Sequence, residues 1–185
     1  PYFRRFVKRF PTIQSLARAS RDDVLKAWEN MGYYARARHL HEAAGQLVED
    51  HVGKLPATPE GLLSLPGIGA YTAGAILSIA FEKPVPAIDG NVRRVLSRLM
   101  ALRKPLREPS VQKKIEKAAQ ALMPKDRPGQ FNQAMMDLGA TVCLPRNPAC
   151  EKCPLAGSCL ARLRGLQNDI PAVPKRAALP HRAVT

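Results

Sequence analysis

The sequence has few acidic residues for its length. Its 185 residues include 29 Lys and Arg but only 15 Asp and Glu, so the formal net charge is +14. A compact chain of this charge repels itself, and a polyanionic partner, either nucleic acid or an anionic membrane surface, is therefore expected. The basic residues are spread from Arg4 to Arg182 and are not gathered on one amphipathic helix, which favours nucleic acid over a membrane.

Long apolar runs are also missing. No run reaches the roughly 18 residues that a membrane span needs, and no signal peptide opens the chain, so we expect a soluble intracellular protein. The chain begins at Pro1 rather than Met, within a stretch of helical periodicity, so we expect a fragment. Its hydrophobic content of 45% is enough for a core in one domain or two small lobes.

The alternation typical of β-strands is absent, whereas apolar residues recur three and four apart almost throughout, so an all-α protein is predicted. Ser20 is expected to cap a helix and to form a capping box with Asp23, and Thr58 followed by Pro59 is expected to begin another. The predicted helices are 2–10, a helix containing 24–28, 33–50, 59–65, 70–81, 89–102, 110–123 and 130–142. The proline-spaced basic text after Cys159 predicts a linker.

Two glycines separate helical patterns in "LPGIGAYTAGAI", residues 65–76. Gly67 and Gly69 allow a tight turn that presents N–H groups at the start of the next helix, where the dipole favours an anion such as a phosphate. The alternative is a structural corner in which the glycines only permit close packing. The basic excess, with the preceding Leu65 and Pro66, favours a hairpin that grips a DNA backbone without reading its sequence.

Asp89, in "VPAIDGNVRRVLSRL", has two compatible interpretations. A short carboxylate before a helical pattern is a helix N-cap, worth about 1 kcal/mol. Gly90 and Asn91 leave the carboxylate sterically open, and Arg93 and Arg94 follow a turn later, where they can hold an anionic substrate. At the rim of a DNA-binding cleft this carboxylate can stabilise positive charge that develops on a sugar.

All four cysteines lie within residues 143–159, in the pattern C-x6-C-x2-C-x5-C. Zinc sites more often pair two C-x2-C units, and this sequence has only one. Disulfides need an oxidising compartment, which nothing in the sequence indicates.

Four motifs together carry a family resemblance. The stretches "MGYYARARHLHEAA", "LPGIGAYTAGAILSIAF" and "PAIDGNVRRVLSRL" and the cysteine spacing resemble the helix-hairpin-helix DNA glycosylases, the superfamily of endonuclease III, and especially its adenine DNA glycosylases of the MutY type. The resemblance runs from Pro1 to about Arg182. It implies a two-lobed all-α fold with a helix-hairpin-helix lobe at 1–85, an iron–sulfur lobe at 86–164 and a basic, proline-containing linker at 165–185.

The resemblance also assigns roles to residues. Asp89 is the implied catalytic aspartate, and Asn91 and Tyr71 are implied to orient and stabilise the reacting sugar. Tyr71 stands where enzymes of the endonuclease III kind carry a lysine that attacks the sugar, so a monofunctional glycosylase is implied. Tyr33 is the implied wedge beside the damaged base; ordinary packing between helices is the alternative for Tyr33 and Tyr34. The implied DNA contacts are Tyr33, Arg36, Arg38, Leu65, Pro66, Gly67, Ile68, Gly69, Arg93 and Arg146.

The cysteine spacing is the one by which this family holds a [4Fe–4S] cluster, so the resemblance implies that cofactor. The implied ligands are Cys143, Cys150, Cys153 and Cys159. The cluster is expected to serve structure first, because the loop has little apolar material around which to fold. Arg146 and Lys152 on the loop can reach phosphates.

The implied activity is hydrolysis of the bond between deoxyribose and an adenine mispaired with 8-oxoguanine or guanine, by a monomer acting on double-stranded DNA, with no membrane partner. Two alternatives remain: a related glycosylase that acts on another base, and a noncatalytic DNA-binding module with a structural metal. The expected location is the cytoplasm, near the nucleoid, in a bacterium, and the nucleus or mitochondrion in a eukaryote.

The family's general acid is a glutamate on a helix upstream of the "PYFRRF" segment, and its C-terminal recognition domain would follow Thr185. None of Glu29, Glu42 and Glu60 lies in the matching motif. The 185-residue chain is therefore expected to bind DNA but to excise adenine very poorly.

Overall fold

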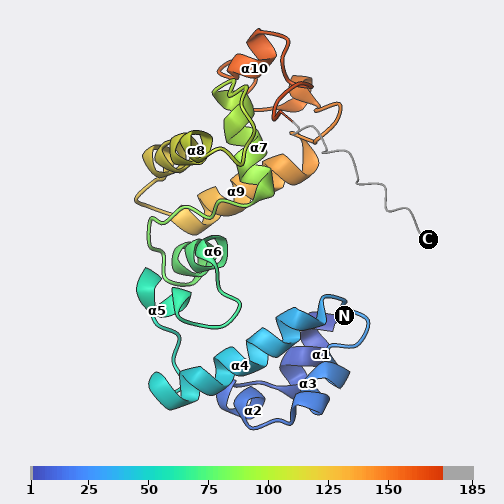
Figure 1. The fold of residues 1–185 in the computed structure, drawn as a ribbon, viewed down its shortest axis with the longest axis vertical. Coiled ribbons are helices and arrows are strands. Elements are labelled where there is room, and N and C mark those ends of the chain that lie inside the picture. Colours follow the sequence, from blue (N-terminus) through green and yellow to red (C-terminus); the bar gives the residue numbers. More distant parts are fainter. Residues whose placement is uncertain (1, 173–185) are drawn as a thin grey trace, which may run out of the picture. The chain divides into compact units, whose positions relative to one another are not determined.

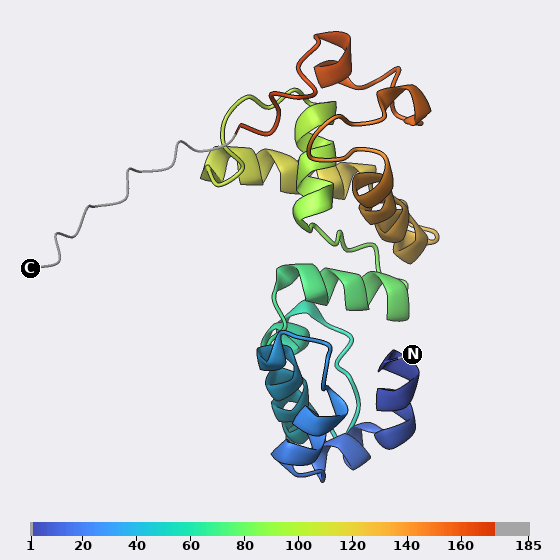
Figure 2. The same ribbon diagram turned by 90° about the vertical axis from the view of Figure 1, so that its right-hand side faces the viewer.

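The computed structural model describes residues 2–172, and the regular elements in this range are all helical (Figures 1 and 2). The predicted all-α class is confirmed. The chain divides between Ala87 and Ile88 into two compact units. Within the described range, no helix combines the length and apolarity that crossing a bilayer requires.

The first unit is built around one long helix. Its elements are α1 (Tyr2–Arg9), α2 (Ile13–Ala17), α3 (Arg21–Ala27), α4 (Tyr34–Asp50), α5 (Pro59–Leu63) and α6 (Ala70–Ala80). In Figure 1, α4 runs beside α2 and α3, and α5 packs against α6. One apolar core comprises Phe6, Phe10, Leu16, Val24, Ala37 and Ala44. A second core comprises Ala43, Leu47, Leu62, Leu65, Ala73 and Leu77. Because α4 contributes buried alanines to both cores, it joins the two halves of this unit.

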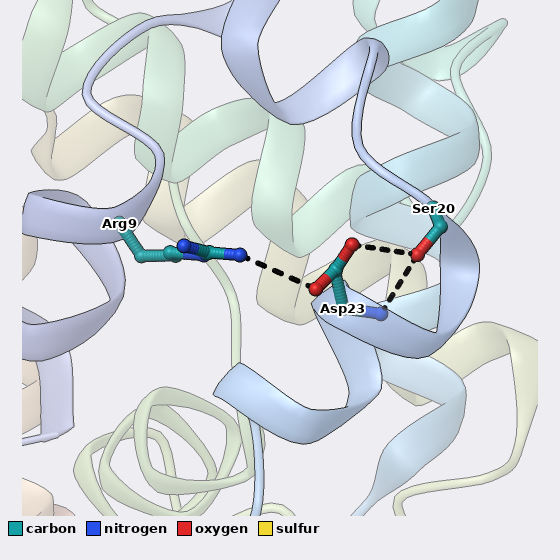
Figure 3. A network of polar contacts seen from close by, with 3 residues as sticks. All are labelled: Arg9, Ser20 and Asp23. Carbon is teal, nitrogen blue, oxygen red and sulfur yellow. Dashed lines mark hydrogen bonds and ion pairs between the residues drawn. The ribbon is translucent and has the colours of Figure 1, made fainter.

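A polar network links α1 to the start of α3 (Figure 3). The Ser20 hydroxyl accepts a hydrogen bond from the Asp23 N–H at 3.1 Å, which confirms Ser20 as the N-cap. The predicted capping box is wrong in one respect, because the Asp23 carboxylate accepts from the Ser20 hydroxyl at 2.8 Å rather than from its backbone N–H. The carboxylate also forms an ion pair with Arg9 at 3.2 Å. A complete capping box occurs instead between Thr12 and Ser15, at the N-terminus of α2.

The second unit surrounds α7 (Gly90–Leu99). Its other elements are α8 (Pro109–Leu122), α9 (Pro128–Thr141), the short 3-10 helix η1 (Cys150–Lys152) and α10 (Leu160–Leu163). Helix α7 contacts α8, α9 and α10 (Figure 1). The core of this unit comprises Val92, Val95, Leu96, Val111, Ile115, Ala119 and Met135. The apolar face of α7 thus fixes the helix whose first residues carry the candidate site.

Three short elements were not predicted from the sequence: α2, η1 and α10. All the helices that the sequence predicts are present, and their ends differ from the predicted ones by a few residues. Most of the predicted linker, 173–185, lies outside the described residues. In its described part Ile170 is 2% exposed, so this position packs into the second unit. The lobe boundaries at 85 and 164 stay a prediction.

Candidate functional site

Asp89 is the N-cap of α7, as predicted. Its Oδ1 accepts the Val92 N–H at 2.7 Å, and its Oδ2 accepts from the Asn91 side-chain amide at 3.1 Å. The residue is half-buried. Two hydrogen bonds therefore fix the orientation of the carboxylate, and the residue keeps part of its surface accessible to a ligand.

Arg94 connects this carboxylate to the cysteine loop. Its Nη2 donates to Asn91 Oδ1 at 2.9 Å and to the Gly139 carbonyl at 2.7 Å, and its Nε donates to the Cys143 carbonyl at 2.8 Å. Burial holds the pKa of the Arg94 guanidinium below its usual range. The expectation that Arg94 holds a substrate anion stays a prediction, and in the structure its Nε and Nη2 bind protein acceptors. Arg94 thus braces Asn91, and through Asn91 it braces Asp89.

Close backbone packing supports the same arrangement. A Cβ atom on Gly139 would lie 2.5 Å from the Asn91 Cβ and 3.1 Å from the Asn91 Cα. Such distances are far below van der Waals contact, so only glycine lets α9 pass this close to the start of α7. The sequence pattern gave no signal for this contact.

The four cysteines lie together in the second unit, and none of them forms a disulfide. They line one cavity with three polar residues, Arg98, Arg162 and Gln167. Burial raises the pKa of the Cys150 thiol, and the neighbouring cysteine thiolates raise it further. In residues 2–172 no three His, Cys, Asp or Glu side chains converge closely enough to hold a single ion. All four cysteines line the same cavity, so they are placed to hold a single polynuclear cluster.

Arg98 supplies a second test of that fit. It is 2% exposed, and its donors reach the carbonyls of Ile170 at 2.8 Å, Leu144 at 2.6 Å and Pro145 at 3.0 Å, together with Cys143 Sγ at 3.3 Å. No carboxylate in the described chain forms an ion pair with it. A buried cation is costly without a counter-charge. Cluster-bound thiolates would supply that negative charge, so the residues present fit an iron–sulfur cofactor.

The hairpin between α5 and α6 lies in the first unit. Gly67 has φ of +77°, a conformation that favours glycine, and a Cβ there would lie 2.6 Å from the Cβ of His39. Gly69 is exposed and caps α6 without a side chain, so the N–H groups of the first turn are not covered by a cap. Leu65 is 3% exposed and belongs to the core, so its side chain packs inside rather than facing solvent.

A cavity of about 250 Å³ adjoins this hairpin. It is lined by Trp28, Arg36, His39, Leu40, Ala43, Pro66, Gly67, Ile68, Thr72 and Ile76. The structure thus brings the predicted Arg36 to the same hollow as Pro66, Gly67 and Ile68. His39 and Thr72 also line it, and sequence reasoning did not single them out.

Tyr33 is 83% exposed and has φ of 46° and ψ of 51° at the N-cap of α4. Left-handed backbone is uncommon for a residue with a bulky side chain and marks a locally constrained position. Tyr34 is 43% exposed, so neither tyrosine of the pair is buried. Tyr71, in the first turn of α6, is 42% exposed.

The remaining basic candidates lie on different elements. Arg38 on α4 and Arg93 on α7 are half-buried, and Arg146 on the cysteine loop is exposed. The structure brings some of the predicted residues together in each unit. In the second unit, hydrogen bonds connect Asp89 to Asn91, Asn91 to Arg94, and Arg94 to the Cys143 carbonyl. In the first unit, Arg36 and the hairpin line the same cavity.

Comparison with known proteins gives this arrangement a family. Residues 1–125 match the HhH-GPD superfamily of base excision DNA repair proteins, and residues 143–159 match the iron–sulfur binding domain of endonuclease III. The second match confirms the predicted iron–sulfur cofactor at the four cysteines.

Several relatives that are similar over most of this chain are adenine DNA glycosylases. That of Rattus norvegicus is 45% identical over 94% of this chain and 34% of its own length. That of Homo sapiens is 45% identical over 91% of this chain and 31% of its length. That of Buchnera aphidicola subsp. Schizaphis graminum is 40% identical over 87% of this chain and 46% of its length. The chain thus spans about a third of the mammalian relatives and just under half of the bacterial one.

Solved structures confirm the predicted helix-hairpin-helix glycosylase fold. A thermostable thymine-DNA glycosylase superposes with a TM-score of 0.78 at 27% identity, over 88% of this chain and 75% of its own. A trapped endonuclease III–DNA covalent intermediate superposes with a TM-score of 0.75 at 26% identity, over 89% and 76%. On these grounds the chain belongs to the HhH-GPD superfamily of base excision DNA repair proteins.

Proposed function

We propose that this chain is the core of a monofunctional DNA glycosylase that hydrolyses the N-glycosidic bond of adenine mispaired with 8-oxoguanine or guanine. The observation that carries this proposal is 45% identity to an adenine DNA glycosylase over 94% of the chain. The braced carboxylate of Asp89 supports the same activity.

Loss of adenine from deoxyribose is slow because the base leaves as a poor anion while the sugar acquires the character of a cation. A carboxylate held under the sugar stabilises that cation, as in the hydrolysis of other glycosides. Asp89 takes this role in our proposal. The hydrogen bonds from Val92 N–H and the Asn91 amide hold the charge in place before the reaction, and a preorganised charge stabilises a transition state without reorganisation. Arg94 keeps Asn91 in position.

Tyr71 and Tyr33 complete the proposed chemistry. A phenol cannot form a Schiff base with the sugar, so Tyr71 favours hydrolysis without strand cleavage. Removal of a base from the stack costs a few kcal/mol, and an aromatic side chain that enters the stack compensates for part of it. Tyr33, 83% exposed on constrained backbone, suits this wedge role.

Grip on the DNA backbone is assigned to the hairpin and to arginines. The first turn of α6 presents N–H groups beside Gly69, and a helix N-terminus favours phosphate. Arg36 borders the hollow next to the hairpin, and Arg38, Arg93 and Arg146 are the further phosphate contacts we propose. The cluster, held by the four cysteines, supplies a rigid anchor for the loop that carries Arg146.

The test is a glycosylase assay on duplexes with adenine opposite 8-oxoguanine, guanine or cytosine, with the protein as its gene encodes it. Excision from the first two duplexes is expected. Asp89→Asn should lower the excision rate at least about 100-fold and leave DNA affinity within about twofold. Asp126→Asn, at a carboxylate with an 83% exposed side chain, serves as the matched control and should change neither.

Two outcomes would contradict the proposal. Excision of thymine or another base instead of adenine would favour a different glycosylase of the fold, which the likeness to a thymine-DNA glycosylase makes the second candidate. An Asp89→Asn protein that excises adenine at the original rate would remove Asp89 from the reaction.

A further inference from the structure

The cavity that the four cysteines line also has three other polar residues in its lining. Apart from the cysteines, its lining is apolar except for Arg98, Arg162 and Gln167. Figure 1 shows the orange and red segment after α9 passing around the end of α7, which brings Gln167, from beyond α10, to the same cavity as the cysteine loop. Gln167 is thus a neutral side chain that can form hydrogen bonds, in a cavity whose other polar residues are arginines and cysteines.

Arg98 has five N–H donors, and four of them have acceptors in the structure. Its Nε and both terminal nitrogens bind three backbone carbonyls, and Nη1 also lies 3.3 Å from Cys143 Sγ. Arg98 therefore offers the cluster one N–H to sulfur contact and one buried positive charge.

Gln167, in contrast, has a side-chain atom without a hydrogen-bond partner. Its Oε1 is buried and has no hydrogen-bond partner, and among the described residues it is the one buried side-chain nitrogen or oxygen in that state. Leaving a buried acceptor unsatisfied costs about 1–3 kcal/mol, and such an atom requires a specific explanation. Rotation of the amide about its last bond exchanges Oε1 with Nε2, and this terminal torsion is broad and nearly two-fold. The rotated amide would present N–H donors in place of the unsatisfied oxygen.

Sulfur in an iron–sulfur cluster carries negative charge and accepts hydrogen bonds, and those bonds, with nearby charge, tune the reduction potential. We propose that the side-chain amide of Gln167 donates an N–H to a sulfur of the bound cluster. Together with Arg98 it forms a donor shell that raises the reduction potential of the cluster. The inference uses the confirmed cofactor and does not depend on which base the protein excises.

The first test is a redox titration of cluster-loaded protein. Gln167→Met keeps the length of the side chain but removes both donors, so the midpoint potential should shift to more negative values, because the reduced cluster carries more negative charge and loses more stabilisation. Gln167→Glu adds a negative charge and should shift it further in the same direction. Asn168→Ala, at the exposed neighbouring residue, is the matched control and should leave the potential unchanged. An unchanged potential in loaded Gln167→Met would overturn the proposal.

A second measurement covers the case in which the variants do not load the cluster. In the unaltered protein, glutamine labelled with ¹⁵N at the side-chain amide should give a hyperfine coupling to the cluster in its paramagnetic state by pulsed EPR. Among the described residues Gln167 is the one glutamine that lines the cavity, so such a coupling identifies it. Absence of the coupling in loaded protein would overturn the proposal, whatever the variants do.

Discussion

At position 139 the second unit has room for glycine alone. Gly139→Ala would place a methyl group 2.5 Å from the Asn91 Cβ and 3.1 Å from its backbone, so α9 and the start of α7 must move apart. Overpacking of this kind costs about 1–3 kcal/mol. We expect a loss of unfolding free energy in this range, measured by urea denaturation, and slower adenine excision, because Asn91 holds Asp89.

Gly157 is the control for that substitution. It lies in the cysteine loop, has no atom within 4 Å of a built Cβ, and does not have positive φ. Gly157→Ala should therefore keep both stability and activity. Equal stability of the two variants would show that the α7–α9 contact is looser than the structure indicates.

The roles of some residues could be predicted from the sequence, whereas those of others could not. Asp89 could be foreseen as a cap because a short carboxylate before a helical pattern acts locally, and the cysteines could be foreseen from their spacing. Arg98 could not, because its carbonyl partners lie as many as 72 residues away along the chain. The contacts of Arg94 could not be foreseen for the same reason: its acceptors at Gly139 and Cys143 are in place only once α9 has packed on α7.

At the scale of elements, the junction of α1 and α3 should respond to acid (Figure 3). The hydrogen bond from Ser20, helped by Arg9, lowers the pKa of Asp23 below its ordinary value of 3.8. A carboxylate with a lowered folded-state pKa contributes stability that is fully present above the unfolded-state pKa and is lost as pH falls through the folded-state value. The stability difference between the original protein and Asp23→Asn should thus be constant near neutrality and shrink below about pH 4, as measured by urea denaturation across pH.

Ser20→Ala provides the internal check on this prediction. It removes the largest cause of the lowered pKa, so the acid-dependent part of the Asp23→Asn difference should diminish in that background. A difference that keeps one value from neutral pH to pH 3 would contradict the role given to the network.

Helices with long apolar periodicity and a clear cap followed from the sequence. Ser20, Thr58 and Asp89 all cap their helices as expected, because side-chain capping acts within a few residues. The five-residue α2 and the four-residue α10 were missed, since a single turn carries too few apolar positions to show a period. The burial of Ile170 in the second unit was not predicted, because the sequence around it resembles a linker. Ile170 is held there by the hydrogen bond from Arg98 to its carbonyl and by packing of its side chain.

The charge of the whole molecule leads to a prediction about affinity. With a net charge of +14, binding to duplex DNA should release counterions, and about six phosphate contacts give a slope of roughly −5 for log affinity against log salt concentration. Arg36→Ala should weaken binding to all duplexes alike and make the slope shallower by about 1. Lys114→Ala on α8, outside the proposed contacts, is the control and should keep the slope. Fluorescence anisotropy across a salt series measures both, and an affinity that does not change with salt would contradict phosphate binding as the source of the grip.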